Sequence, residues 1–577
     1  MTSAPSTSSP APAWCLWRNP ILRRFLRTRL RPRALGASLL IVLIIAGFIF
    51  AMARTLGKSQ METQAYYARA ELAEGLPASP LQMTMDSVER MYLIPLLILQ
   101  GFILFVVGTG QVAGGMTADA DEGTMDYMRL SPMTPLAKVL GYLFGLPVRE
   151  WLMFAVTLPF SAWGIWKGAV PASNWVPVYA VVLSAAVLYH LTGLTAGTVL
   201  RNRRWAFLVS MGGVFLLYTL IPQLAKLGLV YCEYLTIMPV VTENLSGFLP
   251  LSAGAALRTV QEFEADVSFF GLDFPEAIFT ILSQLVLCLT FIVMLWRRWK
   301  KPESHLLGKA WASGLSVWIQ IVLLGCALPL ISPGLLFISR RFTMGEGRIY
   351  RNMGNWEPQL SEATAMIIIY GTVSLLGVIL LSLLIAPARD SQITGLRRAQ
   401  RLSSQRIPRF SDEAPSLPFV CFMSLAAAAG WTLFARGVIE SHWFPGQFLP
   451  SWTPFVFGLV ILTTSVCGAL LYELRGAKGI FLALILAGVL PVLIGSVMAA
   501  AAREFSVASV WITSASPFMA PANAVTTALP DAIGNHTPMQ VAGPRAFIFW
   551  QGLMVLAAIW LWRKHRAESH RRAEAGD

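Results

Sequence analysis

The sequence has few charged residues for its length. Charged residues make up 13% of the 577, apolar residues make up 55%, and the mean hydropathy is +0.59. This composition excludes a soluble globular protein and predicts an integral membrane protein. The net charge of +14 would suit nucleic acid, anionic lipid or cytoplasmic loops. Its distribution along the chain favours loops, so we expect membrane lipids and no nucleic acid as partners.

The sequence also lacks the motifs of the common catalytic chemistries. The nucleotide-binding pattern GxxxxGK[ST] is absent, since Gly57-Lys58-Ser59 has no leading glycine. HExxH, GxSxG and CxxC do not occur either, and the six cysteines are scattered, mostly within apolar runs. We therefore expect a protein that is not an enzyme, with no catalytic residues, no metal site and no cofactor of its own.

The N-terminal region changes character at Asn19. Residues 1–17 are rich in Ser, Pro and Ala and are predicted to be disordered. Asn19 and Pro20 then form a helix-start signal, after which apolar residues and arginines alternate on opposite faces up to Arg31. This pattern predicts an amphipathic helix on the membrane surface. A soluble core helix is the weaker alternative, because a span-length apolar run follows directly.

About twelve apolar runs are long enough to cross a membrane as helices. They lie near residues 35–54, 89–112, 136–162, 175–200, 205–222, 276–296, 311–332, 361–387, 417–437, 452–473, 478–501 and 543–562. With a cytoplasmic N-terminus, that side holds roughly 30 Lys and Arg residues and the other about 11. The sequence thus predicts an all-α, multi-pass protein of the plasma (inner) membrane with both termini in the cytoplasm.

The second six spans repeat the spacing of the first six. Corresponding starts are offset by roughly 270 residues, which indicates an internal duplication. The segments 250–259 and 517–526 share Pro, two Ala and Thr in register, although small-residue sequence could match by coincidence. We predict a first six-span half over 18–300 and a second, diverged half over 301–577 with a basic tail.

Two long segments precede the last span of each half. Residues 223–275 and 502–542 are too polar to cross a bilayer but contain apolar pieces interrupted by proline. Irregular backbone at membrane depth is tolerated where it contacts protein or lines a water-filled path. A translocation pathway and a packed outer cap are equally compatible with this pattern.

Arg149 and Glu150 are the most conspicuous charges inside a predicted span. Such charges are costly in lipid and normally face the bundle interior or a wet cavity, which suggests an intramembrane pair or part of a pathway. The alternative is that Pro147 breaks the span and leaves both near an interface. Gly141 and Gly145 form a small-xxx-small pair, which is typical of close helix packing.

The polar stretch from Asp119 to Pro135 separates the second and third spans. Asp121 and Glu122 are placed where a helix start favours negative charge, and Ser131-Pro132 would end the helix. The stretch therefore predicts a short helix outside the membrane. It could lie on the bilayer surface or contact a soluble partner.

Two segments together carry a family resemblance. Asn19-Pro-Ile-Leu-Arg-Arg-Phe-Leu-Arg27 before the first span, and Asp121-Glu-Gly-Thr-Met-Asp-Tyr-Met-Arg-Leu-Ser-Pro-Met-Thr-Pro135 after the second, resemble type-two ABC transporter permeases, the exporter family. The resemblance implies six spans per permease domain, an interfacial helix, and a loop helix that docks on a separate ATPase. The ATPase-coupling residues that it implies are Asp121, Glu122, Gly123, Thr124 and Asp126.

The second half departs from this pattern. Its loop from Arg389 to Arg401 is strongly basic and lacks the Glu-x-Gly-Thr core. We therefore expect the permease subunit of an ATP-driven exporter, with ATP and Mg bound by a partner ATPase, and with a second permease chain as a further partner to consider. The alternatives are an ion-gradient-driven secondary transporter, for which Glu150 is the candidate carboxylate, and a non-transporting membrane scaffold that an ATPase recruits.

Overall fold

The computed structural model describes residues 16–73, 83–225, 227–249, 266–301, 303–331, 360–387, 389–401, 407–441, 444–501, 506–529 and 537–574. Ten helices in these residues are long and apolar enough to cross a membrane, or eleven if one bent pair counts as a span. The predicted membrane class is therefore confirmed. Most of the predicted disordered N-terminus and the 250–259 match lie outside the described residues.

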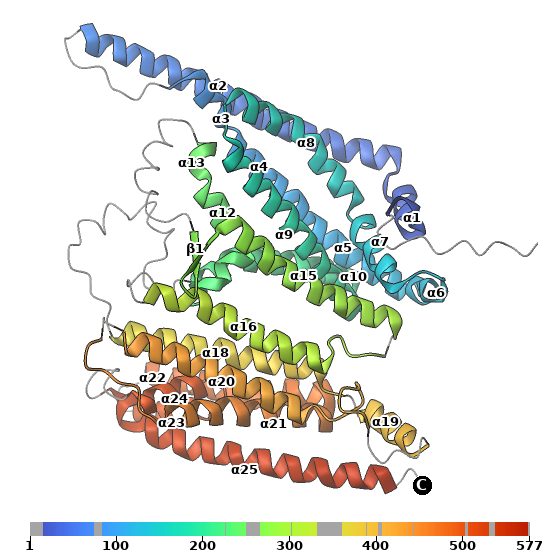
Figure 1. The fold of residues 1–577 in the computed structure, drawn as a ribbon, viewed down its shortest axis with the longest axis vertical. Coiled ribbons are helices and arrows are strands. Elements are labelled where there is room, and N and C mark those ends of the chain that lie inside the picture. Colours follow the sequence, from blue (N-terminus) through green and yellow to red (C-terminus); the bar gives the residue numbers. More distant parts are fainter. Residues whose placement is uncertain are drawn as a thin grey trace, which may run out of the picture.

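The helices that could span are long and run roughly parallel to one another (Figure 1). In chain order they are α2 (Pro32–Ala73), α4 (Leu93–Gly101) continued through a π-helical stretch (Phe102–Gly108) into α5 (Thr109–Asp121), α7 (Pro135–Gly145) with α8 (Val148–Lys167), α9 (Ala172–Val199), α10 (Arg203–Thr219), α15 (Glu276–Lys300), α16 (Lys309–Ile331), α18 (Leu360–Ile385), α20 (Leu417–Ile439), α21 (Thr453–Ala483) continued through a second π-helical stretch (Leu484–Val489) into α22 (Leu490–Ala501), and α25 (Pro538–Glu574).

Two of these helices are interrupted. α7 and α8 meet at an angle of 51° at Pro147, whose ring removes a backbone donor and disfavours a continuous helix. Gly476 inside α21 has φ 68° and ψ −165°, a conformation essentially restricted to glycine. The second interruption falls between the predicted spans 452–473 and 478–501.

One end of the bundle carries the short helices that the sequence placed outside the membrane. These are α1 (Pro20–Arg29), α6 (Thr124–Leu130) and α19 (Arg389–Arg401), and the last turns of α25 lie at the same end (Figure 1). Asn19 caps α1 as predicted, because its Oδ1 accepts from Ile21 N at 3.0 Å and from Leu22 N at 3.4 Å. A short 3-10 turn (Leu16–Arg18) precedes this cap.

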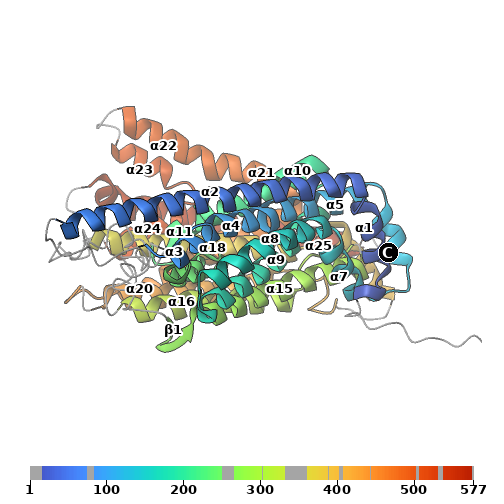
Figure 2. The ribbon, with the colours of Figure 1, turned by 90° about the horizontal axis from the view of Figure 1, so that it is seen from above.

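The opposite end holds short elements between the long helices. They are α3 (Met85–Arg90), α11 (Ile221–Ala225), η3 (Val230–Leu235), α12 (Met238–Glu243), α13 (Leu245–Phe248), β1 (Asp266–Phe269), β2 (Leu272–Pro275), α23 (Ser506–Thr513) and α24 (Ala520–Ala528). α23 lies against α22 and also contacts α25, and in Figure 2 α22 and α23 project from one side of the bundle.

The hairpin of β1 and β2 was not predicted. Its strands pair antiparallel around Phe270 and Gly271, which both have positive φ. The Phe270 amide donates to the Gly325 carbonyl of α16 at 2.9 Å, and the Phe269 ring lies directly over Gly325. This tertiary contact holds a bulky residue in a conformation that local preference disfavours.

Buried apolar side chains form two clusters. One draws on α1, α4, α5, α7 and α9, and the other on α16, α18, α20, α21 and α24. α15 contributes to both, with Cys288 in the first cluster and Met294 in the second. η3 and β1, which precede α15 in the chain, belong to the second cluster through Tyr231 and Val267.

Candidate functional site

α6 is a two-turn helix set off from α5 by one glycine. Asp121 is the last residue of α5, and Glu122 caps that helix, so the new helix starts at Thr124 rather than at Asp121. Gly123 has φ 69° in the left-handed region and redirects the chain between the two helices. α6 ends at Leu130, with Ser131 as its C-cap, as the Ser-Pro signal predicted.

The two faces of α6 differ sharply. Met125 is buried, and Met128 packs against the first apolar cluster. Tyr127 is 74% exposed and Leu130 is 84% exposed on the other side. Large apolar side chains at this exposure, close to the exposed Glu122 that precedes the helix, are suited to a protein contact.

The charges of α6 differ in their freedom to engage a partner. Asp126 is exposed and forms an ion pair with Arg129 one turn later on the same helix. Exposed pairs of this kind contribute little to stability. Asp121 and Glu122 are exposed at the junction. The five residues singled out from the sequence thus form one continuous surface segment.

Lys138 of α7 binds the C-terminal end of α6. Its Nζ donates to the carbonyl oxygens of Arg129 at 3.1 Å and of Ser131 at 3.3 Å. A cation at the last carbonyls of a helix offsets their partial negative charge. α6 is therefore attached to α7 as well as to α5, and it is not a free loop.

Asp119 forms the main polar junction beneath the surface segment. Its Oδ1 accepts from Arg24 Nη2 of α1 at 2.8 Å, and its Oδ2 accepts from the Tyr142 hydroxyl of α7 at 2.8 Å. Burial lowers the pKa of the Arg24 guanidinium, but the hydrogen bond and charge of Asp119 outweigh this, and the pKa is raised. We call Asp119, Arg24 and Tyr142 the Asp119 junction; it joins α1, α5 and α7.

α1 packs against α7 across the two glycines of the small-xxx-small pair. A Cβ atom on Gly141 would lie 2.8 Å from Asn19 Oδ1, and one on Gly145 would lie 2.5 Å from Phe25 Cδ2. The Asn19 side chain also donates to the Ala137 carbonyl at 2.6 Å. The pair therefore packs closely as predicted, and its partner is the interfacial helix α1.

Sequence reasoning missed the Asp119 junction and Lys138. Asp119 stood at the edge of the polar stretch and had no local feature that set it apart from Asp121. The available signal was its position three residues after Met116, which is buried on the same helix. Such a carboxylate needs partners, but the sequence does not identify them.

Arg149 and Glu150 lie in the first turn of α8, directly after the break at Pro147. Arg149 donates to Glu150 Oε1 from Nη2 at 3.0 Å and from Nε at 3.2 Å. Glu150 is fully buried, and its Oε2 has no hydrogen-bond partner in the structure. α8 also contacts α1, and Arg149 and Glu150 form an ion pair.

The predicted second half has a different junction at the same end of the bundle. Glu473 of α21 is buried and accepts from Ser416 N at 3.1 Å, Ser416 Oγ at 2.6 Å and Gln392 Nε2 at 3.2 Å. His565 Nε2 of α25 lies 2.8 Å from Glu473 Oε2, the oxygen to which Gln392 also donates. We call this group the Glu473 junction; it connects α19, α20, α21 and α25.

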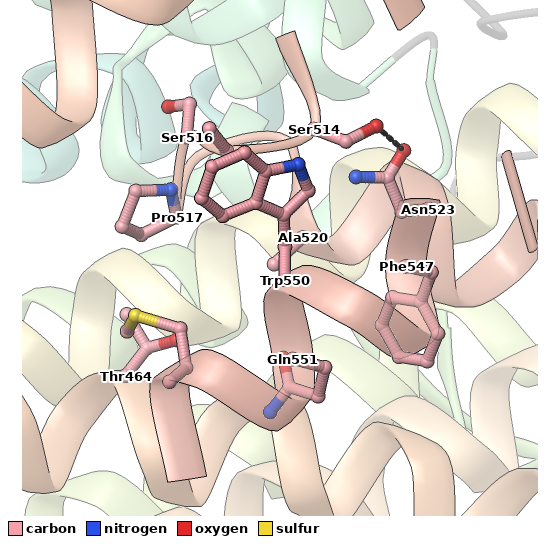
Figure 3. Close-up of a pocket in the computed structure, with 11 residues that line it drawn as sticks. Thr464, Ser514, Ser516, Pro517, Ala520, Asn523, Phe547, Trp550 and Gln551 are labelled. Atoms are coloured by element: carbon pink, nitrogen blue, oxygen red, sulfur yellow. Dashed lines mark hydrogen bonds between the residues drawn. The ribbon is translucent and has the colours of Figure 1, made fainter. Parts of the chain in front are cut away.

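A small pocket lies at the opposite end, between α21, α24 and α25 (Figure 3). The Ser514 hydroxyl donates to Asn523 Oδ1 at 3.3 Å, and Phe547 and Trp550 form apolar walls. The Thr464 hydroxyl is buried without a partner. The space holds about one water molecule, so the segment 506–529 packs as a cap here.

Within the described ranges, no three His, Cys, Asp or Glu side chains come together as they would around a metal ion. Comparison of the chain with protein-family models, with curated proteins and with solved structures finds no match.

Proposed function

We propose that this chain is the membrane-spanning permease subunit of an ATP-driven ABC exporter, and that a separate ATPase subunit docks on α6. The observation that carries the proposal is an exposed helix with firmly attached ends. Tyr127 and Leu130 face outward, while Met125, Lys138 and the Asp119 junction hold the helix to the bundle. ATP and Mg belong to the partner, since this sequence has no nucleotide-binding motif.

A movement of α6 would directly displace the membrane-spanning helices α5 and α7. α6 follows α5 after two residues, and Lys138 and Tyr142 connect the same region to α7. Packed helices and charge-assisted hydrogen bonds move as rigid units rather than deforming gradually. A partner that closes on ATP would therefore displace α5, α7 and α1 together and favour alternate access to the substrate path.

We further propose twelve crossings in two permease-like halves, 18–300 and 301–577. The helix Thr453–Ala501 has 49 residues and would be about 74 Å long if straight, more than twice a hydrocarbon core of about 30 Å. The break at Gly476 divides it into two crossings. Together with the bent pair α7 and α8, this gives twelve.

The orientation that we propose places α1, α6, α19 and the end of α25 in the cytoplasm of a cell with a plasma (inner) membrane. All four lie at one end of the bundle (Figure 1). The basic segments of the sequence fall at this end, including the last turns of α15 and α19. The positive-inside rule assigns such an end to the cytoplasm.

A charge reversal at Glu122 tests the proposal. The chain is co-purified with a candidate ATPase subunit, and Glu122→Lys and Asp126→Lys are compared with Asp273→Lys, which changes an exposed carboxylate of β2 at the opposite end. Glu122→Lys should reduce both assembly and stimulated ATPase activity, while Asp273→Lys should change neither. Unchanged assembly and activity in both α6 variants would refute the docking assignment.

An ion-gradient-driven transporter is the second candidate, and Glu150 is the observation that favours it. A fully buried carboxylate with one unpartnered oxygen is a feature of proton-coupled carriers. Its other oxygen is in an ion pair with Arg149 at 3.0 Å. Flux in liposomes that follows an imposed ion gradient without ATP would select this candidate, and ATP-dependent flux would exclude both it and a non-transporting scaffold.

A further inference from the structure

The residues 411–416, which lead into α20, form a short turn with a compact backbone. The Ala414 amide donates to the Ser411 carbonyl at 3.3 Å, and the Ser416 carbonyl accepts from Val420 N at 3.1 Å in the first turn of α20. We call these residues the 411–416 segment. It contacts both the last turn of α15 and α19, at the end of the bundle that also carries α6 (Figure 1).

Asp412 connects this segment to α15, the last span of the proposed first half. Its Oδ1 accepts from Arg297 Nη2 at 2.5 Å, and Arg297 Nε donates to the His305 carbonyl at 3.3 Å. The ion pair is largely shielded from solvent, with 22% of the Arg297 side chain and 18% of the Asp412 side chain exposed. Solvent and salt weaken such a pair less than one at the surface.

Lys309, the first residue of α16, holds the backbone of the segment in place. Its Nζ donates to the Ser411 carbonyl at 2.6 Å and also to the Ala414 carbonyl. Lys309 is buried, and a buried ammonium group needs such acceptors in place of water. The segment is therefore attached to the end of α15 and to the start of α16.

Glu413 connects the same segment to α19. Its Oε1 accepts from Arg398 Nη1 at 2.9 Å, and Lys301 at the end of α15 lies 3.8 Å from that oxygen. The α19 backbone packs directly on this side chain, because a Cβ atom added to Gly395 would lie 2.5 Å from the Glu413 Cβ atom. A buried carboxylate thus joins elements of different proposed halves.

The last turn of α15 also packs against the residues that hold α6. Trp299 is buried there, and its ring centre lies 5.4 Å from that of Tyr142 and 5.8 Å from Lys138 Nζ. Lys138 is the residue that donates to the carbonyls at the end of α6. Contacts between side chains therefore continue from α6 through the end of α15 to α19.

We propose that the 411–416 segment links the two halves mechanically, and that Asp412 and Glu413 are positioning residues that keep α19 in place relative to α15. Arg297 passes a displacement of α15 to Asp412, and Glu413 passes it to α19, because a compact turn held by Lys309 moves as a unit. This inference rests on the proposed function for its consequence: an ATPase bound at α6 would displace α19 without a contact of its own.

A variant distant from α19 tests the link. Arg297 is bonded to Asp412 and to the His305 carbonyl, so Arg297→Gln changes the end of α15 and leaves the contacts of α19 intact. Lys300→Gln is the matched control, since it removes an exposed cation from the same turn. Hydrogen–deuterium exchange of the full chain in detergent is followed by mass spectrometry in residues 389–401, with α2 as the reference for global unfolding.

We expect exchange in α19 to be about 5-fold faster in Glu413→Gln and at least about 2-fold faster in Arg297→Gln. Lys300→Gln should leave it unchanged, and Arg297→Lys, which keeps a cation for Asp412, should restore most of the protection. An effect of Glu413→Gln with none of Arg297→Gln would reduce Glu413 to a local contact and overturn the link. If α2 also exchanges faster in Arg297→Gln, the isosteric Asp412→Asn decides the matter by the same criterion.

A second arm adds the candidate ATPase subunit and ATP. The wild-type chain should show an ATP-dependent change of exchange in α19, and Glu413→Gln should lose this change while assembly at α6 is retained. A response of α19 that persists in Glu413→Gln would overturn the link and leave docking at α6 intact. A wild-type chain that fails to assemble counts against the proposed function, and the link is then decided by the first arm, which contains no ATPase.

Discussion

Removal of the Asp119 carboxylate should destabilise the contact of α1 with α5 and α7. In Asp119→Ala the Tyr142 hydroxyl, which is fully buried, loses its acceptor, and an unpaired buried hydroxyl costs about 1–3 kcal/mol. The Arg24 side chain is 30% exposed and can recover water, so its share is about 1 kcal/mol at most. The expected total is therefore about 1–4 kcal/mol.

A double-mutant cycle separates this junction from a general cavity effect. Tyr142→Phe alone leaves the pair of Asp119 with Arg24 and should cost about 0.5–1.5 kcal/mol. In the double variant no hydroxyl is left unpaired. The cost of Asp119→Ala and Tyr142→Phe together should therefore fall at least about 1 kcal/mol below the sum of the single changes.

The measurement is the unfolding free energy of the purified chain in mixed micelles, titrated with SDS and followed by tryptophan fluorescence. Trp299 reports the region directly, because its ring centre lies 5.4 Å from that of Tyr142. Costs that add to within about 0.5 kcal/mol would refute the hydrogen bond between Asp119 and Tyr142 as the source of the coupling.

Three further perturbations test other contacts. Gly145→Ala places a Cβ atom 2.5 Å from Phe25 and should cost about 1–3 kcal/mol, whereas Gly212→Ala, with no atom within 4 Å, should be neutral or stabilising in the same SDS titration. Glu473→Ala leaves buried donors unpaired and should lower the apparent Tm by several degrees, with no change expected if the junction is only a surface contact. Burial lowers the pKa of His305 in the folded chain, so the neutral imidazole's contribution to stability is complete above about pH 6.5 and is lost as the pH falls toward the lower folded pKa. His305→Gln should flatten that part of the profile of Tm against pH. An unchanged profile would contradict the role of His305 in the pH dependence.

Sequence signals located the elements of the site well because those signals are local. Asn19 before Pro20 marked the start of α1, and Ser131 marked the end of α6. A cap or a helix breaker acts through its own neighbours, and so it can be recognised without knowing the fold. The glycine pair at 141 and 145 likewise predicted close packing, although it could not identify α1 as the partner.

The remaining features depend on contacts distant in sequence. Phe270 adopts a positive φ only because Gly325, some 55 residues later, accepts its amide and leaves room for Phe269. Asp119 is distinguished from Asp121 by Arg24 and Tyr142, which come from other helices. Neither case has a local pattern to read, because the stabilising partner is supplied by tertiary structure.

The loops that correspond in the two proposed halves are held by opposite arrangements of charge. In the proposed first half the carboxylate of Asp119 comes from the helix that leads into the loop, and the acidic Glu122 is exposed just before α6. In the second half Glu473 comes from a later span, the loop supplies the neutral Gln392, and α19 presents Arg398 and other arginines. This explains how the second loop is held without the Glu-x-Gly-Thr core.

The difference has a consequence for the proposed partner. An ATPase made of two identical subunits offers two identical docking surfaces, and no single surface is complementary in charge to both the acidic segment from Asp121 to Asp126 and the basic helix α19. Under the proposed function we therefore expect two different ATPase chains, or one engaged subunit at α6. Co-purification of the Arg398→Glu variant distinguishes these, since that exchange should remove only a partner bound at α19 and leave one bound at α6 in place.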